Sequence, residues 1–328
     1  DGGNYELTPM YHVIMPVDLR VSLNLAKAYP NKLSGSFVAE TEIVAKRMFK
    51  WLDCMSHGDD KISFFNDSAF GIAPENAVVR EYAEKLGFDV SRDALSDLVV
   101  SDLVDTGYVS VRGPEFTLLA DLAAVGPDYQ PGHAHADTLS FEFSIAFDRV
   151  FVNSGISEYG VSKERVRQRG TATHNTVEVN GNNSSEVWSG FRVARRARIV
   201  EKSVSDIIDG KVEFSAAHNG YKQIGEGVIH KRSWTVSETE FTFVDELKGE
   251  ACSIVGYLHV HPNVEVVETS SNKVQLTAGT KTVVISVEGA DLALQDSTWH
   301  PEFGIVIPNK KLIFNFFGNK AITKVCWY

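Results

Sequence analysis

From about Asp105 to the end of the chain, apolar and polar residues alternate with a period of two, as in half-buried β-strands. Clusters of Gly, Asn and Asp separate these segments. So many strands without helices between them predict stacked antiparallel sheets, and therefore a large β-sandwich. The predicted strands are residues 108–112, 115–122, 139–147, 150–153, 176–180, 228–236, 241–247, 254–261, 282–287 and 312–317.

The first 90 residues carry helix signals instead. Thr8 is a predicted N-cap, and Pro9 takes the first position of a helix that reaches about Ala28. A second, amphipathic helix is predicted over residues 38–55, and a third over residues 74–87, between a proline start and a glycine stop. Their apolar faces need further helices to cover them, so we interpret this segment as part of a larger helical domain.

Composition limits the class of protein. The 328 residues are 43% hydrophobic, which suits a globular chain of one large or two medium domains. A net charge of -11 argues against a nucleic-acid partner, and no apolar run approaches the roughly 20 residues that span a bilayer. We therefore predict an α+β multidomain chain without nucleic-acid or membrane partners. Its helical segment covers residues 1–95, its antiparallel β-sandwich domain covers residues 96–328, and the hinge lies at about 90–105.

Two histidines stand directly before the clearest predicted strand, in Gly132-His133-Ala134-His135-Ala136-Asp137. If extended backbone reaches back to Gly132, both imidazoles point to one side, because side chains two apart in a strand share a face. Beside Asp137 they could then bind a metal or move protons. The alternative is a surface turn with two solvated histidines.

Six sequence blocks follow one another in a recognisable order. They are Asp1-Gly2-Gly3-Asn4-Tyr5-Glu6-Leu7-Thr8-Pro9-Met10-Tyr11-His12, Phe65-Asn66-Asp67-Ser68, Gly132-His133-Ala134-His135-Ala136-Asp137, Asn153-Ser154-Gly155, Arg169-Gly170-Thr171-Ala172-Thr173-His174-Asn175-Thr176-Val177 and His218-Asn219-Gly220-Tyr221. Together they resemble the heparinase II/III-like polysaccharide lyases, of which they match the C-terminal half to two-thirds. The resemblance implies the C-terminal part of an incomplete α/α toroid, followed by a large antiparallel β-sandwich, with the active site between them.

The resemblance also implies β-elimination at a uronic acid of an acidic polysaccharide. Tyr11 matches the catalytic tyrosine, which protonates the leaving oxygen and can act as a base in syn geometry. His133 matches the catalytic histidine, the base for the opposite epimer. In the family, an Asn or His on an upstream helix neutralises the substrate carboxylate, and no residue here corresponds to it.

A metal site is implied as well. His135, Asn153 and His174 align with the ligands of a structural metal ion, Zn²⁺ by its preference for imidazole nitrogen. Asn153 stands where an Asp is usual, and its neutral amide oxygen is a weaker ligand. The alternative is a hydrogen-bonded cluster of these three residues without a metal.

Substrate contacts are expected at His12, Asn66 and Arg169. His12 follows Tyr11, Asn66 lies in a block from the helical side, and Arg169 belongs to an arginine series with a spacing of two that would share one face of a strand. A turn-forming role explains Asn66 equally well. A periplasmic or secreted location follows from the resemblance alone, and the oligomeric state is not predicted.

Two classes of function remain. The first is a polysaccharide lyase that uses Tyr11 and His133. The second is a non-catalytic glycan-binding or structural module, with the chain an incomplete fragment of the enzyme. A metal-dependent enzyme built directly on His133 and His135 is a weaker third reading.

Overall fold

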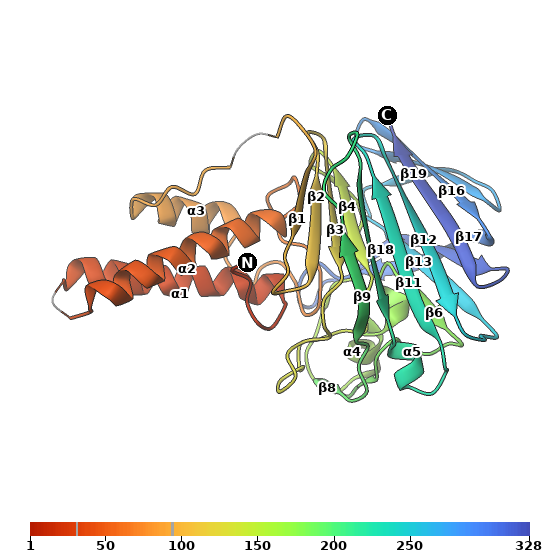
Figure 1. Ribbon diagram of the computed structural model, residues 1–328, viewed down its shortest axis with the longest axis horizontal. Helices are drawn as coiled ribbons and strands as arrows, with labels where there is room; N and C mark the ends of the chain where they lie inside the picture. Colours follow the sequence, from red (N-terminus) through yellow and green to blue (C-terminus); the bar gives the residue numbers. More distant parts are fainter. Residues whose placement is uncertain (31, 93–94) are drawn as a thin grey trace.

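The protein, described by a computed structural model over residues 1–30, 32–92 and 95–328, consists of a helical arm and a large β-sandwich (Figure 1). The predicted fold class is thereby confirmed. The predicted hinge includes residues 93–94, which lie outside the described residues, so the domain boundary stays a prediction. No described helix combines the length and apolar character that crossing a membrane requires.

Three helices make up the arm in the described part of the chain, and the start of α1 and the end of α2 both lie next to the sandwich (Figure 1). Pro9 begins α1 as predicted, although the Thr8 side chain forms no capping hydrogen bond. The Ser34 hydroxyl caps α2 by accepting from the Phe37 N–H. Both α2 and α3 pack against α1. Their bounds are Pro9–Ala28 for α1, Gly35–Cys54 for α2 and Asn76–Lys85 for α3.

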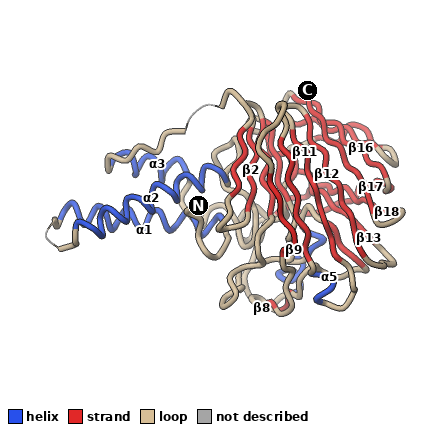
Figure 2. The backbone as a smooth tube through the Cα atoms, viewed as in Figure 1, coloured by secondary structure: helices blue, strands red, loops and turns tan. Residues whose placement is uncertain are grey.

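Two antiparallel sheets form the sandwich (Figure 2). Within the described ranges, the first sheet has nine strands in the order β1-β2-β3-β4-β5-β13-β18-β17, with β6 paired to β13. Their bounds are β1 Val99–Asp102, β2 Tyr108–Arg112, β3 Phe116–Asp121, β4 Phe141–Ile145, β5 Asp148–Phe151, β6 Val177–Val179, β13 Ile254–Val260, β17 Ala290–Trp299 and β18 Ile307–Phe316.

The second sheet has eight strands in the described residues, in the order β14-β15-β16-β19-β12-β11-β10-β9. Its strands are β9 Ile199–Val204, β10 Val212–His218, β11 Ile229–Val236, β12 Glu240–Lys248, β14 Glu265–Thr269, β15 Lys273–Ala278, β16 Lys281–Glu288 and β19 Lys320–Trp327. A separate hairpin joins β7 Val187–Trp188 to β8 Arg192–Val193, and the short helices are α4 Lys163–Gln168 and α5 Gly220–Gln223.

The main core lies between the two sheets. Alternate residues of β11 and β12 are buried there, which is the period-two pattern of their sequences. In contrast, β3 and β4 are buried on both faces. A second apolar cluster covers the outer face of this part of the first sheet, and it includes Trp51 and Met55 from the arm together with Tyr108 and Leu119 from the sheet.

Buried hydrogen bonds also join the arm to the sandwich. The polar residues of the predicted strand 139–147 do not face solvent, because the loop after α2 covers them. His57 Nε2 donates to Glu142 Oε2 at 2.9 Å, and the Ser144 hydroxyl lies 2.9 Å from His57 Nδ1. Glu142 also accepts from the backbone N–H of Phe64. These buried hydrogen bonds fix how the arm meets β4, and so position the loop that carries Asp67.

Candidate active site and histidine pair

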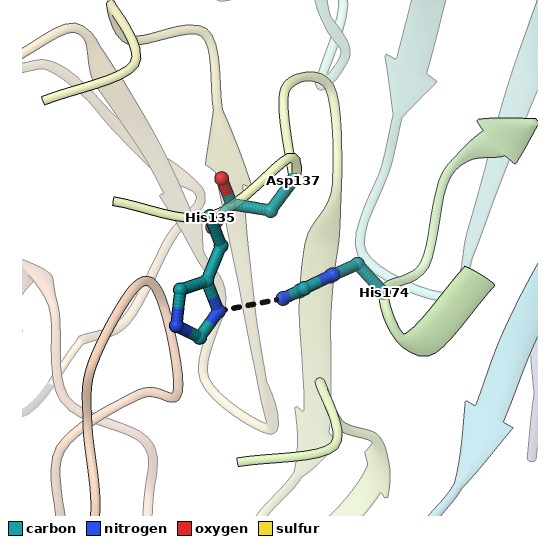
Figure 3. Close-up of side chains that lie close together, drawn as sticks. All are labelled: His135, Asp137 and His174. Carbon is teal, nitrogen blue, oxygen red and sulfur yellow. Dashed lines mark hydrogen bonds between the residues drawn. The ribbon is translucent and has the colours of Figure 1, made fainter. Parts of the chain in front are cut away.

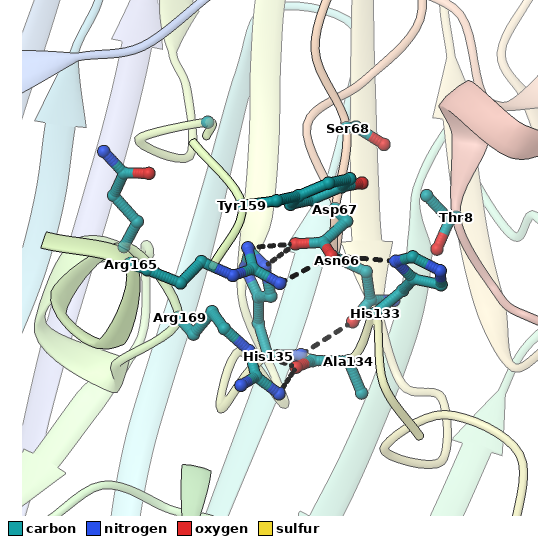
Figure 4. A network of polar contacts seen from close by, with 12 residues as sticks. Thr8, Asn66, Asp67, Ser68, His133, Ala134, His135, Tyr159, Arg165 and Arg169 are labelled. Atoms are coloured by element: carbon teal, nitrogen blue, oxygen red, sulfur yellow. Dashed lines mark hydrogen bonds and ion pairs between the residues drawn. The ribbon is translucent and has the colours of Figure 1, made fainter. Parts of the chain in front are cut away.

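The predicted catalytic residues meet where the arm joins the sandwich. Tyr11 comes from the first turn of α1. Asp67 comes from the loop after α2, His133 from the loop between β3 and β4, and Arg165 from α4 (Figure 4). The site therefore uses segments from both parts of the chain, as the resemblance implied.

The buried carboxylate of Asp67 holds this site together. Its Oδ2 accepts from His133 Nδ1 at 2.9 Å, and its Oδ1 accepts from His135 Nε2 at 2.8 Å. The Arg165 guanidinium pairs with both oxygens. Burial opposes ionisation, but these donors outweigh it and hold the pKa of Asp67 below its ordinary value. The carboxylate therefore stays ionised and acts only as an acceptor.

Asp67 sets the tautomer of His133. Because the carboxylate only accepts, Nδ1 of His133 carries a proton, and in the neutral ring Nε2 keeps a lone pair. The His133 side chain is 21% exposed, so the ring is not sealed from solvent. The Tyr11 ring lies 4.6 Å from the His133 ring, and the Tyr11 hydroxyl is 2.9 Å from the Tyr159 hydroxyl. Burial raises the pKa of Tyr11, so the phenol keeps its proton at neutral pH.

The loop around His133 and His135 differs from the predicted strand. Residues 132–137 form turns and irregular backbone, and β4 begins only at Phe141. The two histidines do not share a strand face, but both bind Asp67. The expected strand geometry is thereby corrected, and the expectation that these histidines bind a metal or move protons stays a prediction.

His135 and His174 form an unusual pair. His135 Nδ1 lies 3.1 Å from His174 Nε2 (Figure 3). His135 donates through its other nitrogen to Asp67, and His174 Nδ1 donates to the Gly170 carbonyl at 2.8 Å. Both acceptors lack a proton to give, so the two facing nitrogens each present a lone pair. Burial lowers the pKa of both rings, that of His135 to about 4, which disfavours a proton held between them at neutral pH.

A second buried histidine pair, His218 and His230, has a proton between its facing nitrogens. His230 Nδ1 lies 3.3 Å from His218 Nε2. There the Gly220 N–H donates to His218 Nδ1, so His218 Nε2 carries a proton and donates to His230, which in turn donates to Asp245. Every nitrogen of that pair has a complementary partner. The His135–His174 pair lacks such a proton, and a cation between the two lone pairs would satisfy both.

The third predicted ligand is not supported by its contacts. The Asn153 amide oxygen accepts from the Asn175 N–H at 3.2 Å, and its nitrogen lies 3.5 Å from the Ser140 hydroxyl. Asp137 instead offers a carboxylate oxygen, because this atom and the two facing histidine nitrogens all lie within 4.8 Å of one another. We therefore replace Asn153 by Asp137 in the candidate ligand set.

The predicted substrate contacts at Asn66 and Arg169 are wrong, because both side chains are buried and occupied. Asn66 donates to the Leu7 carbonyl at 2.8 Å and accepts from the His135 N–H at 3.0 Å. Arg169 donates to the carbonyls of Ala134 and Gly190. Both residues thus shape the backbone around the two histidines.

The arginine series is also helical rather than extended. Arg165 lies in α4, and Arg169 follows its last residue. The two residues are four apart, so they share one side of the helix and both reach Gly190. Arg167 points elsewhere and pairs with Glu164. No sequence pattern pointed to Tyr159, whereas Asp67 was expected, together with Asn66, to shape the cleft from the helical side or to form a turn.

His12 is corrected from a substrate contact to a packed helix residue. It is fully buried, its Nε2 donates to the Met48 carbonyl at 2.9 Å, and its Nδ1 accepts from the Asn4 N–H. Its ring lies 4.2 Å from the Trp51 ring. Burial lowers the pKa of His12 to about 4, despite the bond to Met48.

This burial predicts a pH-dependent stability. Between pH 6.5 and about 4, an unfolded histidine binds a proton that folded His12 does not, so the free energy of unfolding falls as the pH falls. At pH 5 the loss is about 2 kcal/mol for this residue. Urea unfolding of the wild type and of His12→Gln at pH 7 and pH 5 checks it. The variant should lose about 2 kcal/mol less between these pH values, and an equal loss in both proteins would contradict the argument.

Comparison with known proteins places these features in a family. Residues 98–327 match the family model described as heparinase II/III-like, C-terminal. A heparin-sulfate lyase of Bacteroides stercoris is 22% identical over 315 residues, which are 90% of this chain and 43% of that protein.

Solved structures agree in fold. The heparan sulfate lyase HepC from Pedobacter heparinus has a TM-score of 0.76 at 16% identity, over 100% of this chain and 53% of that chain. A heparinase III has a TM-score of 0.78 at 17% identity, over 99% of this chain and 54% of its own. At such identities the likeness shows the fold. The chain spans about half the length of the relatives it matches.

Proposed function

The chain belongs to the heparinase II/III-like family, and from that premise we propose that it acts as a polysaccharide lyase on a uronic-acid-containing polysaccharide. The observation that carries the proposal is the contact between Tyr11 and His133. A phenol that holds its proton lies against an imidazole whose Nε2 lone pair is free. β-Elimination needs both a base and an acid of this kind.

The reaction can be written with these two residues. His133 Nε2 removes the proton at C5 of the uronic acid, the electron pair forms the C4–C5 double bond, and the C4–O4 bond breaks. Tyr11 gives its phenolic proton to the leaving O4 oxygen. For the opposite epimer, in syn geometry, Tyr11 must first give up its phenolic proton, and the phenolate then removes the C5 proton and returns it to the leaving O4 oxygen. We leave the neutralisation of the substrate carboxylate unassigned, because Arg165 and Arg169 are already bound to Asp67 and to backbone carbonyls.

We further propose that His135 and His174, with Asp137, hold a structural Zn²⁺ ion. The support is the pair of facing lone pairs described above, and each imidazole has the second hydrogen bond that orients metal ligands. Such an ion would brace the loop that carries His133 against the loop that carries His174. The proton transfers belong to Tyr11 and His133.

Removal of the acid or the base tests the lyase proposal. Unsaturated uronates absorb in the ultraviolet, so the chain is incubated with heparan, alginate and glucuronan polymers while absorbance is recorded. Tyr11→Phe and His133→Ala should each lower the turnover number by about a hundred- to ten-thousand-fold. Tyr328→Phe and His261→Ala, two changes outside the site, should keep the wild-type rate.

Two outcomes would count against this proposal. An absorbance rise that persists at the wild-type rate in both site variants would remove Tyr11 and His133 from the mechanism. Polymer binding without any absorbance rise would favour the glycan-binding module. The periplasmic or secreted location stays a prediction.

A further inference from the structure

The β7–β8 hairpin brings large exposed aromatic residues to the edge of the site. Trp188 is 52% exposed and Phe191 is 42% exposed. The Phe191 ring packs edge-on against His133 at 6.0 Å and against Tyr159 at 5.2 Å. Exposed aromatic surface next to a reaction centre is typical of a ligand-binding surface.

Arg165 and Arg169 hold the tip of the β7–β8 hairpin by hydrogen bonds. The Gly190 carbonyl accepts from Arg165 Nε at 2.9 Å and from Arg169 Nη1 at 3.2 Å. A Cβ atom at Gly190 would lie 2.5 Å from the Gly160 carbonyl oxygen, so only glycine permits this close approach. Because Arg165 also binds Asp67, the hairpin tip and the base His133 share one support.

One face of the hairpin combines an aromatic ring with a positive charge. Trp188 pairs directly with Arg192, and Val187 pairs with Val193, so each pair occupies its own face. Val187 is buried and Val193 packs against the small cluster around Ala134, which leaves Trp188 and Arg192 on the outer face. Among the described residues, Arg192 takes part in no salt bridge and Trp188 in no ring contact. In contrast, the exposed rings of Tyr5 and Tyr129 stack on each other.

We propose that Trp188, Phe191 and Arg192 form a subsite for an acidic saccharide that borders His133. A pyranose ring packs its C–H face on the Trp188 indole, and its carboxylate or sulfate pairs with the Arg192 guanidinium. Phe191, on the same hairpin, contacts His133 directly. The inference rests on the proposed lyase function, because it concerns the sugars on either side of the bond that is cut.

The tryptophans of the chain make the subsite directly observable. Of the five, Trp188 is exposed, whereas Trp51, Trp234, Trp299 and Trp327 are at most 6% exposed. Quenching of tryptophan fluorescence by acrylamide therefore reports mainly on Trp188. In the Tyr11→Phe background, which leaves the ligand uncut, a heparan sulfate oligosaccharide should protect the fluorescence from acrylamide. Neutral maltohexaose should protect it much less, because it offers Arg192 no anion.

Variants of Trp188 and Arg192 separate the contribution of the aromatic ring to binding from that of the positive charge. Trp188→Ala should remove the protection and raise the dissociation constant, measured by calorimetry, about tenfold, the equivalent of about 1.4 kcal/mol. Trp188→Phe should retain most of the affinity, and Arg192→Gln should weaken the acidic oligosaccharide but not maltohexaose. Phe317→Ala removes an aromatic residue that is 71% exposed on another turn, and it should change nothing.

The outcomes distinguish the subsite from the lyase proposal. Protection and weakened binding in Trp188→Ala support the subsite even if the wild type yields no unsaturated product, in which case the lyase proposal alone fails. If product forms but Trp188 stays fully quenchable and Trp188→Ala binds like the wild type, the subsite is wrong and the lyase proposal stands. Absence of any oligosaccharide binding also overturns the subsite.

Discussion

With its amide nitrogen facing His133, Asp67→Asn is expected to lower the turnover number by about a thousand- to ten-thousand-fold, an effect of the size known for the aspartate of serine-protease triads. The variant keeps the size of the side chain but replaces one acceptor oxygen by a donor. If the amide nitrogen faces His133, the ring must accept there, so its proton moves to Nε2 and the base is lost.

In the other orientation of the introduced amide, the expected loss is metal binding by the His135–His174 pair. The amide nitrogen then faces His135 Nε2, and the proton of His135 moves to Nδ1, where it donates to His174. The histidine pair then resembles the proton-linked His218–His230 pair, and it loses its affinity for a cation. Either orientation also places a donor against Arg165, so we expect the free energy of unfolding to fall by about 3–5 kcal/mol.

Arg165→Gln is the matched control for Asp67→Asn. It breaks the same ion pair, but it leaves the carboxylate that fixes the tautomer of His133. Both variants should lose stability in urea unfolding, whereas only Asp67→Asn should lose most of the turnover number at a similar KM. ¹⁵N chemical shifts of labelled histidines report the tautomers. A variant Asp67→Asn with wild-type turnover and wild-type metal affinity would show that Asp67 has only a packing role.

The sequence predicted only some of the strands that bury one face, because β15 and β19 were not predicted although alternate residues of both are buried. β11 and β12 match the predicted strands within one residue at each end, because their alternation reflects burial on one face. β9 and β14 were not predicted, because most of their residues are exposed at sheet edges and show no apolar alternation. The hydrophobic pattern carries no information about such strands.

The candidate site was predictable only in part, because its contacts join residues that are far apart in the sequence. The residue types in the six blocks pointed to Tyr11 and His133, but the partner of His133 lies 66 positions earlier in the chain. No spacing rule links Asp67 to His133, since the contact exists only after the arm packs on the sandwich. Asn66 and Arg169 were misassigned because polar residues near a site often serve the backbone, and their burial is a tertiary property.

Zinc binding is the second large effect that we expect, and the histidine pairs supply its control. The wild-type chain should bind Zn²⁺ in a titration against a competing chelator, and removal of the ion should lower the melting temperature by about 5 °C. His174→Ala should abolish this binding, because it removes one of the two facing lone pairs.

His218→Ala alters the other buried pair, whose nitrogens already have complementary partners. It should cost stability but leave the zinc titration unchanged. This comparison matters because the loss of any buried histidine can lower the melting temperature, whereas only a ligand changes the affinity for the ion. Equal zinc affinity in the wild type, His174→Ala and His218→Ala would mean that the His135–His174 pair binds no metal. The conflict between their lone pairs would then have to be resolved by a proton held between the rings, despite the burial that lowers both pKa values.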